Sequence, residues 1–298
     1  MQQLALFDEG HEIESTRIVN VASVPQRSPF RYPGGKTWLV PRLRQWLRFL
    51  EMPPSLFIEP FAGGGSIGLT VAFERLAGHI IMVELDKQVA AVWHTILEGD
   101  GEWLADALVN FQLTPHTVAE ALGRADSTLS VRERAFNTLL KNRVNRGGIL
   151  APGAGLVKHG ENGRGLASRW YPVTLKRRIL DIVAIHDRIT FIEGDGLEIM
   201  LSHAAKQDVA FFIDPPYTAA GKKAGSRLYN CSQLNHNELF NLAASLQGHF
   251  LMTYDDTEEV RELARNHGFA VGVVAMKNTH HAKMTELLIS RDMSWLNL

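Results

Sequence analysis

The 298-residue sequence contains a single cysteine, Cys231. One thiol excludes an internal disulfide and any metal site built from several cysteines, and it suits a reducing compartment. No run approaches the ~20 consecutive apolar residues of a membrane-spanning helix. The N-terminal MQQLALFDEG also lacks the basic start and apolar core of a secretory signal. We therefore expect a globular cytoplasmic protein without membrane association.

The chain also has almost no net charge, at −1, but its charges are unevenly distributed. Between Arg132 and Arg178, eleven Lys or Arg stand against two Glu and no Asp, a local balance of +9 that leaves −10 for the remainder. Such asymmetry favours a segment that faces a polyanion, carried by an acidic body. The alternative is a solvated helical face.

Hydrophobic periodicity divides the chain into three parts. Residues 1–27 show no sustained pattern and are predicted to form a flexible N-terminal arm. Residues 28–100 and 186–298 alternate strand and helix patterns, which predicts an α/β domain with a largely parallel sheet. Residues 101–185 carry helical patterns with glycine-rich breaks and are predicted to be an inserted domain.

Individual elements of the α/β part can be placed from the same patterns. A helix is predicted after RYPGGK, where Leu39, Leu43, Trp46 and Leu47 recur at helical spacing. Further helices are expected over 69–77, 86–97, 235–246 and 257–268. Strands are expected over 55–60, 79–85, 188–195, 208–217, 248–254, 269–276 and 284–290.

The stretch RYPGGKTWL, residues 31–39, looks like the end of a nucleotide-phosphate loop. That motif requires a glycine five residues before Gly35, and the sequence has Phe30 there. A triphosphate site is therefore poorly supported, and the loop must serve another ligand.

A glycine-rich turn follows the first predicted strand of the α/β part. FAGGGSIG contains G-x-G-x-x-G as Gly63, Gly65 and Gly68, and Glu84 ends the next strand. Glycines allow backbone to approach a ligand at a strand-to-helix turn, and a carboxylate on the neighbouring strand can accept hydrogen bonds from ribose hydroxyls. The glycine turn and Glu84 together predict an adenosine-containing ligand. These residues are equally compatible with an oxidoreductase that binds a dinucleotide.

FFIDPPYT, residues 211–218, is more specific. It places Asp214 at the carboxyl end of an apolar strand, where α/β folds bind ligands. Pro215 and Pro216 exclude helix and fix the backbone. Asp214, the Pro215 carbonyl and the Tyr217 ring are thus presented from a rigid turn, unless the stretch is only a turn that ends a strand.

Together these parts resemble the Dam-type (alpha group) DNA adenine-N6 methyltransferases. That family has a glycine-lysine loop, a P-F-x-G-G-G-S loop, a target-recognition domain and D-P-P-Y, in this order. The chain has RYPGGK, EPFAGGGS, the inserted domain over 101–185 with its basic segment, and DPPY in the same order. We call this inserted domain the basic insert. FIEGD, TYDDTEEVRELA and KMTELLIS extend the likeness over nearly everything from Phe30 to Ser290.

The resemblance implies a Rossmann-like S-adenosylmethionine-dependent methyltransferase sheet with helices on both faces. It makes 101–185 the target-recognition (DNA-binding) domain, and 28–100 with 186–298 the catalytic domain. It also implies S-adenosylmethionine as cofactor and duplex DNA as substrate. Lys36 would lie near the methionine carboxylate, Glu84 would bind the ribose in place of the family's usual Asp, and Asp195 would meet the adenine. The implied cofactor-binding residues are Tyr32, Lys36, Glu59, Phe61, Ala62, Gly63, Glu84, Asp195 and Asp214.

The implied catalytic residues are Asp214, Pro215, Pro216 and Tyr217. An exocyclic adenine amine is a poor nucleophile, and hydrogen bonds from N6 to Asp214 and to the Pro215 carbonyl would favour the form that attacks. Direct transfer needs alignment and no covalent intermediate. The target base must leave the duplex, with Tyr217 as a stacking platform.

The basic insert is then expected to contact DNA. Arg and Lys neutralise phosphates, and Arg or Asn can recognise base edges. The candidate DNA-binding residues are Lys141, Asn142, Arg143, Asn145, Arg146, Lys158, Arg164 and Arg169. HGENGRGLASRWYP has no clear counterpart in the family, so neither the recognition sequence nor an association with a restriction-modification system is predicted.

Alternatives remain for the reaction. Cytosine-N4 or RNA-base methylation would use the same fold, although the Asp of DPPY favours adenine, and a non-catalytic DNA-binding protein is a third possibility. Cytosine-C5 chemistry needs a thiolate, and Cys231 lacks a preceding proline, so we expect a packing or loop residue.

Two further stretches suggest binding. The adjacent His280 and His281 would point to opposite faces of a strand and have no completing ligands, so no metal is expected. QLALF, Gln3–Phe7, resembles the pentapeptide that docks bacterial DNA-processing proteins on the replication sliding clamp. The alternative for QLALF is a frayed apolar tail.

Overall fold

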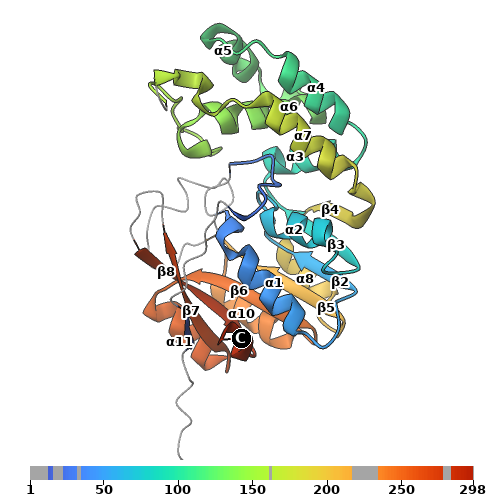
Figure 1. The fold of residues 1–298 in the computed structure, drawn as a ribbon, viewed down its shortest axis with the longest axis vertical. Coiled ribbons are helices and arrows are strands. Elements are labelled where there is room, and N and C mark those ends of the chain that lie inside the picture. The colour runs from blue at the N-terminus through green and yellow to red at the C-terminus, as the bar shows by residue number, and fades with distance from the viewer. Residues whose placement is uncertain are drawn as a thin grey trace, which may run out of the picture.

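The computed structural model describes residues 13–15, 23–31, 35–160, 163–216, 234–277 and 283–297. These residues form one eight-stranded mixed sheet and its covering helices (Figure 1). The strands are β1 (Ile13–Ser15), β2 (Leu56–Glu59), β3 (His79–Glu84), β4 (Ile189–Glu193), β5 (Val209–Ile213), β6 (His249–Asp255), β7 (Ala270–Lys277) and β8 (Lys283–Ser290). The helices are α1 (Val40–Phe49), α2 (Ser66–Glu74), α3 (Lys87–Leu97), α4 (Gly101–Asn110), α5 (Pro115–Gly123), α6 (Val131–Val144), α7 (Pro172–Val183), α8 (Gly196–Ser202), α10 (His236–Ser245) and α11 (Glu258–Asn266).

The strand order is β1-β7-β8-β6-β5-β2-β3-β4. Strands β4, β3, β2, β5 and β6 are parallel neighbours, whereas β8 is antiparallel to both β6 and β7. The chain runs outward from β2 through β3 to β4 and then returns to β5 on the other side of β2. Such a reversal opens a crevice at the carboxyl ends of the two central strands, where ligands bind. The predicted Rossmann-like α/β class is confirmed.

Strand β5 shows why both faces of the sheet are covered. Its sequence VAFFI is buried throughout, and alternate residues enter different cores. Ala210 and Phe212 belong to the core under α1, α2 and α3, while Phe211 and Ile213 pack with α8, α10 and α11. An apolar run without alternation is what a strand buried on both faces requires.

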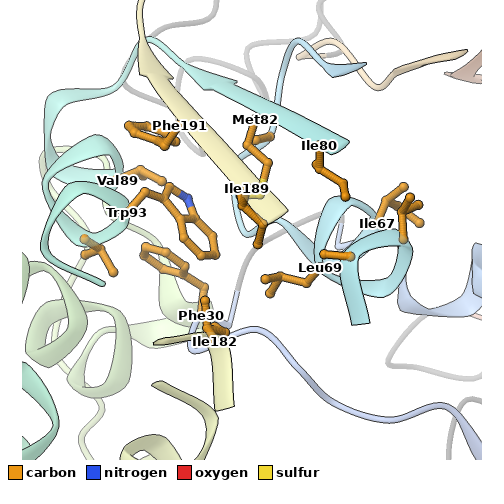
Figure 2. Packing of buried hydrophobic residues seen from close by; sticks show 14 of the residues in the cluster. Phe30, Ile67, Leu69, Ile80, Met82, Val89, Trp93, Ile182, Ile189 and Phe191 are labelled. Carbon is orange, nitrogen blue, oxygen red and sulfur yellow. The ribbon is translucent and has the colours of Figure 1, made fainter. Parts of the chain in front are cut away.

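Trp93 of α3 lies at the centre of the first core. Figure 2 shows its indole beside Val89, Phe191 and Phe30. The Phe30 and Trp93 ring centroids are 5.7 Å apart at 53°. Since Phe30 precedes the glycine-lysine loop, this contact holds the entrance to that loop against α3.

Helices α4 to α7 follow α3 and gather at one end of the molecule, beyond the sheet (Figure 1). Their apolar residues join the core that continues under α3, including Leu104, Leu139 and Ile179. A capping box begins α6, where Ser130 and Glu133 exchange hydrogen bonds. Whether 101–185 is a separate recognition domain stays a prediction.

The segment preceding the body differs in part from the predicted flexible arm. Strand β1 pairs in parallel with β7 at the edge of the sheet. Val24 is buried, and Arg27 forms an ion pair with Glu74 of α2 at 3.1 Å. Strand pairing attaches residues 13–15 to the sheet, and burial and the ion pair attach residues 23–27 to the body. These are long-range contacts that hydrophobic periodicity does not report. Gln3–Phe7 lies outside the described residues.

Most predicted helices and strands of the α/β part are present. Asn235, where the sequence predicts the start of the helix over 235–246, caps α10, and its Oδ1 accepts from the Glu238 N–H at 3.3 Å. The short helix α8 was not predicted. Among the helices that the structure describes, none combines the length and apolarity required to cross a bilayer.

Candidate active site

The glycine loop between β2 and α2 forms a left-handed turn. Gly63 has φ 48° and Gly65 has φ 63°, values that side chains disfavour. A Cβ on Gly65 would approach Met82 Cε at 2.7 Å and Trp93 Cζ2 at 2.8 Å. Conformation thus favours glycine at both positions, and close packing against β3 and α3 requires it at Gly65 as well.

Three hydrogen bonds fasten this loop to its neighbours. The Ala62 N–H donates to the Val83 carbonyl at 2.9 Å, and the Trp93 Nε1–H donates to the Gly63 carbonyl at 2.9 Å. The Gly63 N–H donates to Glu84 Oε2 at 2.8 Å. The two elements that the sequence predicted to share one ligand, the loop and Glu84, are therefore in direct contact.

Glu84 ends β3 and is largely buried. Its Oε1 accepts from the Asp86 N–H at 2.9 Å. Burial raises the pKa of Glu84 to about 7; the backbone donors at Asp86 and Gly63 oppose this rise, and the charge of Asp86 adds to it. Each carboxylate oxygen has a second lone pair, so ribose hydroxyls can still donate to Glu84.

Glu59, at the end of β2, is 3% exposed. Its Oε2 accepts from the Gly68 N–H at 2.8 Å, which ties the first turn of α2 to the sheet. Burial raises the pKa of Glu59 well above its ordinary value, and the charges of Asp214 and Glu84 add to that rise. Glu59 thus lies between the two acidic groups of the predicted site.

Asp195 and Phe61, both predicted to contact the cofactor, lie at the same edge of the sheet. Asp195 is exposed, and its Oδ1 caps α8 by accepting from the Leu197 N–H at 2.8 Å. The preceding Gly194 N–H donates to the Glu84 carbonyl at 3.1 Å, so Asp195 follows directly after a contact with β3. Phe61 is partly buried against the core beneath α8 and α10.

Lys36 has partners that the sequence did not predict. Its Nζ lies 3.0 Å from Asp214 Oδ1 and 2.9 Å from Glu286 Oε1, and the residue is 4% exposed. Burial alone would lower the pKa of Lys36, but Asp214 and Glu286 outweigh it and raise that pKa above its ordinary value. Lys36 is therefore a buried cation directed at DPPY, where the resemblance implied a cofactor carboxylate.

Asp214 follows β5 at the switch point of the sheet. Its Oδ1 also accepts from Thr253 Oγ1 of β6 at 2.7 Å, so two donors orient the same oxygen. Pro215 is buried and Pro216 is partly buried. Tyr217 and Tyr32 lie outside the described residues, as do Cys231, His280 and His281.

Thr253 and Glu286 were missed by sequence reasoning. Glu286 stands between Thr285 and two leucines in the strand TELLIS, and a glutamate inside such an apolar strand is a signal that could have been followed. Thr253 has no comparable signal, because threonine is common in strands.

Three candidate DNA-binding residues are buried, so their side chains do not form a DNA-binding surface in this structure. Asn142 is 0%, Arg143 4% and Asn145 2% exposed. Asn142 bonds the backbone of Arg31 and the Gly148 carbonyl, Arg143 donates to the Pro29 carbonyl, and Asn145 donates to the Ile149 carbonyl. In this structure these three residues connect the end of α6 to its own turn and to residues 29–31, and their DNA-binding role stays a prediction.

The other basic candidates remain accessible. Arg146, Lys158 and Arg164 are exposed, and Lys141 and Arg169 are partly buried. Burial lowers the pKa of Arg143, and the charges of the nearby Arg178, Arg31 and Arg169 lower it further, to about 9. Positive charge therefore gathers where the helical segment meets the residues before the glycine-lysine loop.

No family model and no curated protein matches the chain. Solved structures that match include a proposed RNA methyltransferase from Pyrococcus horikoshii, with 10% identity, TM-score 0.40 and coverage of 92% of this chain and 95% of that one. The rRNA methyltransferase AviRa from Streptomyces viridochromogenes has 13% identity, TM-score 0.35, and coverage of 87% and 86%. Precorrin-6y C5,15-methyltransferase from Geobacter metallireducens has 10% identity, TM-score 0.34, and coverage of 83% and 86%.

At such identities and TM-scores these neighbours carry no argument about reaction or substrate. The fold is established by the strand order itself: a Rossmann-like parallel sheet in which the last strand, β8, enters antiparallel between β6 and β7. This is the α/β architecture that the sequence predicted.

Proposed function

We propose that the protein is an S-adenosylmethionine-dependent methyltransferase that modifies N6 of a flipped-out adenine in duplex DNA. One observation carries the proposal: the glycine loop, Glu84 and Asp214 follow three adjacent parallel strands, β2, β3 and β5. Their carboxyl ends share one edge of the sheet, so an adenosine-binding loop, a ribose acceptor and the Asp of DPPY surround one crevice.

The cofactor half of the crevice suits an adenosine ligand. The left-handed turn at Gly63 brings backbone close to a ligand without side chains in between. Glu84 offers a carboxylate to the ribose hydroxyls, and Asp195 follows the neighbouring strand β4. S-adenosylmethionine, bound there, would supply a methyl group activated by a sulfonium.

Asp214 would serve the acceptor. Lys36 and Thr253 orient its Oδ1, and the carboxylate would accept a hydrogen bond from the adenine N6 amine together with the Pro215 carbonyl. In such a transfer the N6 lone pair would form the new N–C bond, the C–S bond would break with its electron pair going to sulfur, and N6 would release one proton to solvent. The protein contributes alignment and charge, as direct transfer requires.

The exposed basic residues of the helical segment would contact the DNA backbone. Arg146, Lys158 and Arg164 are accessible there, and each can neutralise a phosphate. An apolar small-molecule acceptor would give no reason for this charge.

The test is incubation with unmethylated genomic DNA and labelled S-adenosylmethionine, followed by single-molecule sequencing of the modified bases. N6-methyladenine at one sequence context supports the proposal. Label on cytosine N4, or label only when RNA is supplied, would assign the fold to a different acceptor. Cofactor binding with no transfer to any nucleic acid would contradict the proposal.

A further inference from the structure

Glu286 is a buried acid in the interior of the sheet. It is 4% exposed, on β8, and it pairs with Asp255 of β6 and Val274 of β7. The next two residues, Leu287 and Leu288, are fully buried. A carboxylate in such surroundings is costly unless it has a charged partner.

The partner of Glu286 is Lys36, which bridges two carboxylates. Lys36 Nζ lies 2.9 Å from Glu286 Oε1 and 3.0 Å from Asp214 Oδ1. The three groups carry one net negative charge, and they come from the glycine-lysine loop, β5 and β8. Charge-assisted hydrogen bonds of this length fix geometry more strongly than neutral ones.

Other ionisable groups surround these three. Glu59 of β2 and Tyr254 of β6 both have their pKa raised, first by burial and then by the charge of Asp214, which favours the uncharged form of each. Asp255 faces Glu286 across the ladder and is exposed. Lys36 is thus the cation that balances the buried carboxylates among these described groups.

We infer that Glu286 is a positioning residue for methyl transfer, an inference that rests on the function proposed above. It holds the Lys36 ammonium against Asp214 and thereby fixes the Asp214 carboxylate toward the acceptor amine. It also keeps the net charge of the three groups negative, opposite to the positive charge that N6 gains as the N–C bond forms. Electrostatic preorganisation of this kind acts on the transition state and so on kcat.

The experiment compares E286Q and E286D with wild type, and with E258Q as a matched control. Glu258 is an exposed acid on α11, where it pairs with Arg265 at 2.5 Å. Circular dichroism and thermal unfolding first establish that each variant is folded. Steady-state methylation of DNA is then measured from pH 6 to 10, with both substrates varied.

E286Q should lower kcat by about tenfold to a hundredfold, the size of a lost charge-assisted hydrogen bond, with KM values little changed. Its kcat should also fall at high pH before that of wild type does, because Lys36 with one carboxylate fewer releases its proton more easily. E286D should recover part of kcat and keep the wild-type high-pH limb, and E258Q should match wild type.

A merely structural role would give a different pattern. The inference is overturned if the loss of kcat in E286Q equals the fraction of the variant that is unfolded and its pH profile is that of wild type. The proposed function would remain intact. If E286Q does not fold, E286D decides: unchanged kcat in a folded E286D has the same meaning. No transfer by wild type overturns the proposed function, and this inference with it.

Discussion

Asn142 and Arg31 exchange two hydrogen bonds across 111 residues of sequence. Asn142 Oδ1 accepts from the Arg31 N–H at 2.8 Å, and Asn142 Nδ2 donates to the Arg31 carbonyl at 2.9 Å. The amide group thus pairs with the Arg31 backbone as a neighbouring strand would. Through this contact the end of α6 fixes the residue that precedes the glycine-lysine loop.

Asn142→Ala should destabilise the protein by about 2 to 4 kcal/mol, because it removes the partner of the partly buried Arg31 N–H and of the buried Gly148 carbonyl. It should also lower the single-turnover methylation rate at a temperature where the variant is fully folded. Asn137→Ala is the control: Asn137 is on the same helix and makes one bond, to the Ala121 carbonyl. If Asn137→Ala lowers the single-turnover methylation rate as much as Asn142→Ala does, Asn142 has no specific effect on the glycine-lysine loop.

Gly65→Ala should destabilise the protein by about 2 to 4 kcal/mol, because it combines a left-handed φ with overpacking against Met82 and Trp93. Urea unfolding measures the change. Gly123→Ala is the control, since a Cβ there meets nothing within 4 Å. A Gly65→Ala variant as stable as the control would mean that the loop adapts without strain.

Glu84→Gln should change how stability depends on pH. The folded pKa of Glu84, about 7, exceeds the ordinary value of 4.5, so between these values the native state binds more protons than the unfolded state. Stability contributed by Glu84 is therefore present at low pH and is lost as pH rises through 7, by on the order of 3 kcal/mol.

The wild-type free energy of unfolding minus that of Glu84→Gln should accordingly decrease from pH 5 to pH 8. Urea unfolding at four pH values measures it, with Glu120→Gln on the exposed side of α5 as control. A difference that stays constant, or one that increases with pH, would refute the assignment.

Lys158→Ala and Arg164→Ala should each reduce the salt dependence of DNA binding by about one counterion and weaken binding at low salt. Arg265→Ala on α11 is an exposed control on a different element. Fluorescence anisotropy with a labelled duplex at several salt concentrations gives the slopes. If the dependence of DNA affinity on salt concentration is the same in both variants as in wild type, neither Lys158 nor Arg164 contacts the DNA backbone.

Much of the fold could be predicted because its signals are local. The apolar run VAFFI, the glycines of FAGGGSIG and the acid that ends HIIMVE each constrain a few consecutive residues. Parallel order then follows from alternation of strands and helices. The sequence therefore predicted that Glu84 and Asp214 each stand at the end of a strand.

The partners of these residues were less predictable, because they depend on contacts distant in sequence. Asn142 and Arg143 look like a basic, amide-rich DNA-binding motif, and only their packing on residues 29–31 shows that they are buried. Lys36 has the right chemistry for a cofactor carboxylate. Lys36 contacts Glu286 because β8 lies between β6 and β7 in the sheet, and the sequence does not show that strand order.

The position of β8 has a consequence for folding. Its residues are among the last of the described chain to be synthesised, yet they fill an interior place in the sheet, so β6 and β7 each expose an unpaired edge until β8 arrives. The ammonium of Lys36 and the carboxylate of Glu286 are separated by almost the whole polypeptide and meet only at that step. A ribosome-bound chain that stops before residue 286 therefore lacks the contact between Lys36 and Glu286. Late, non-local strand insertion is the slow kind of folding event.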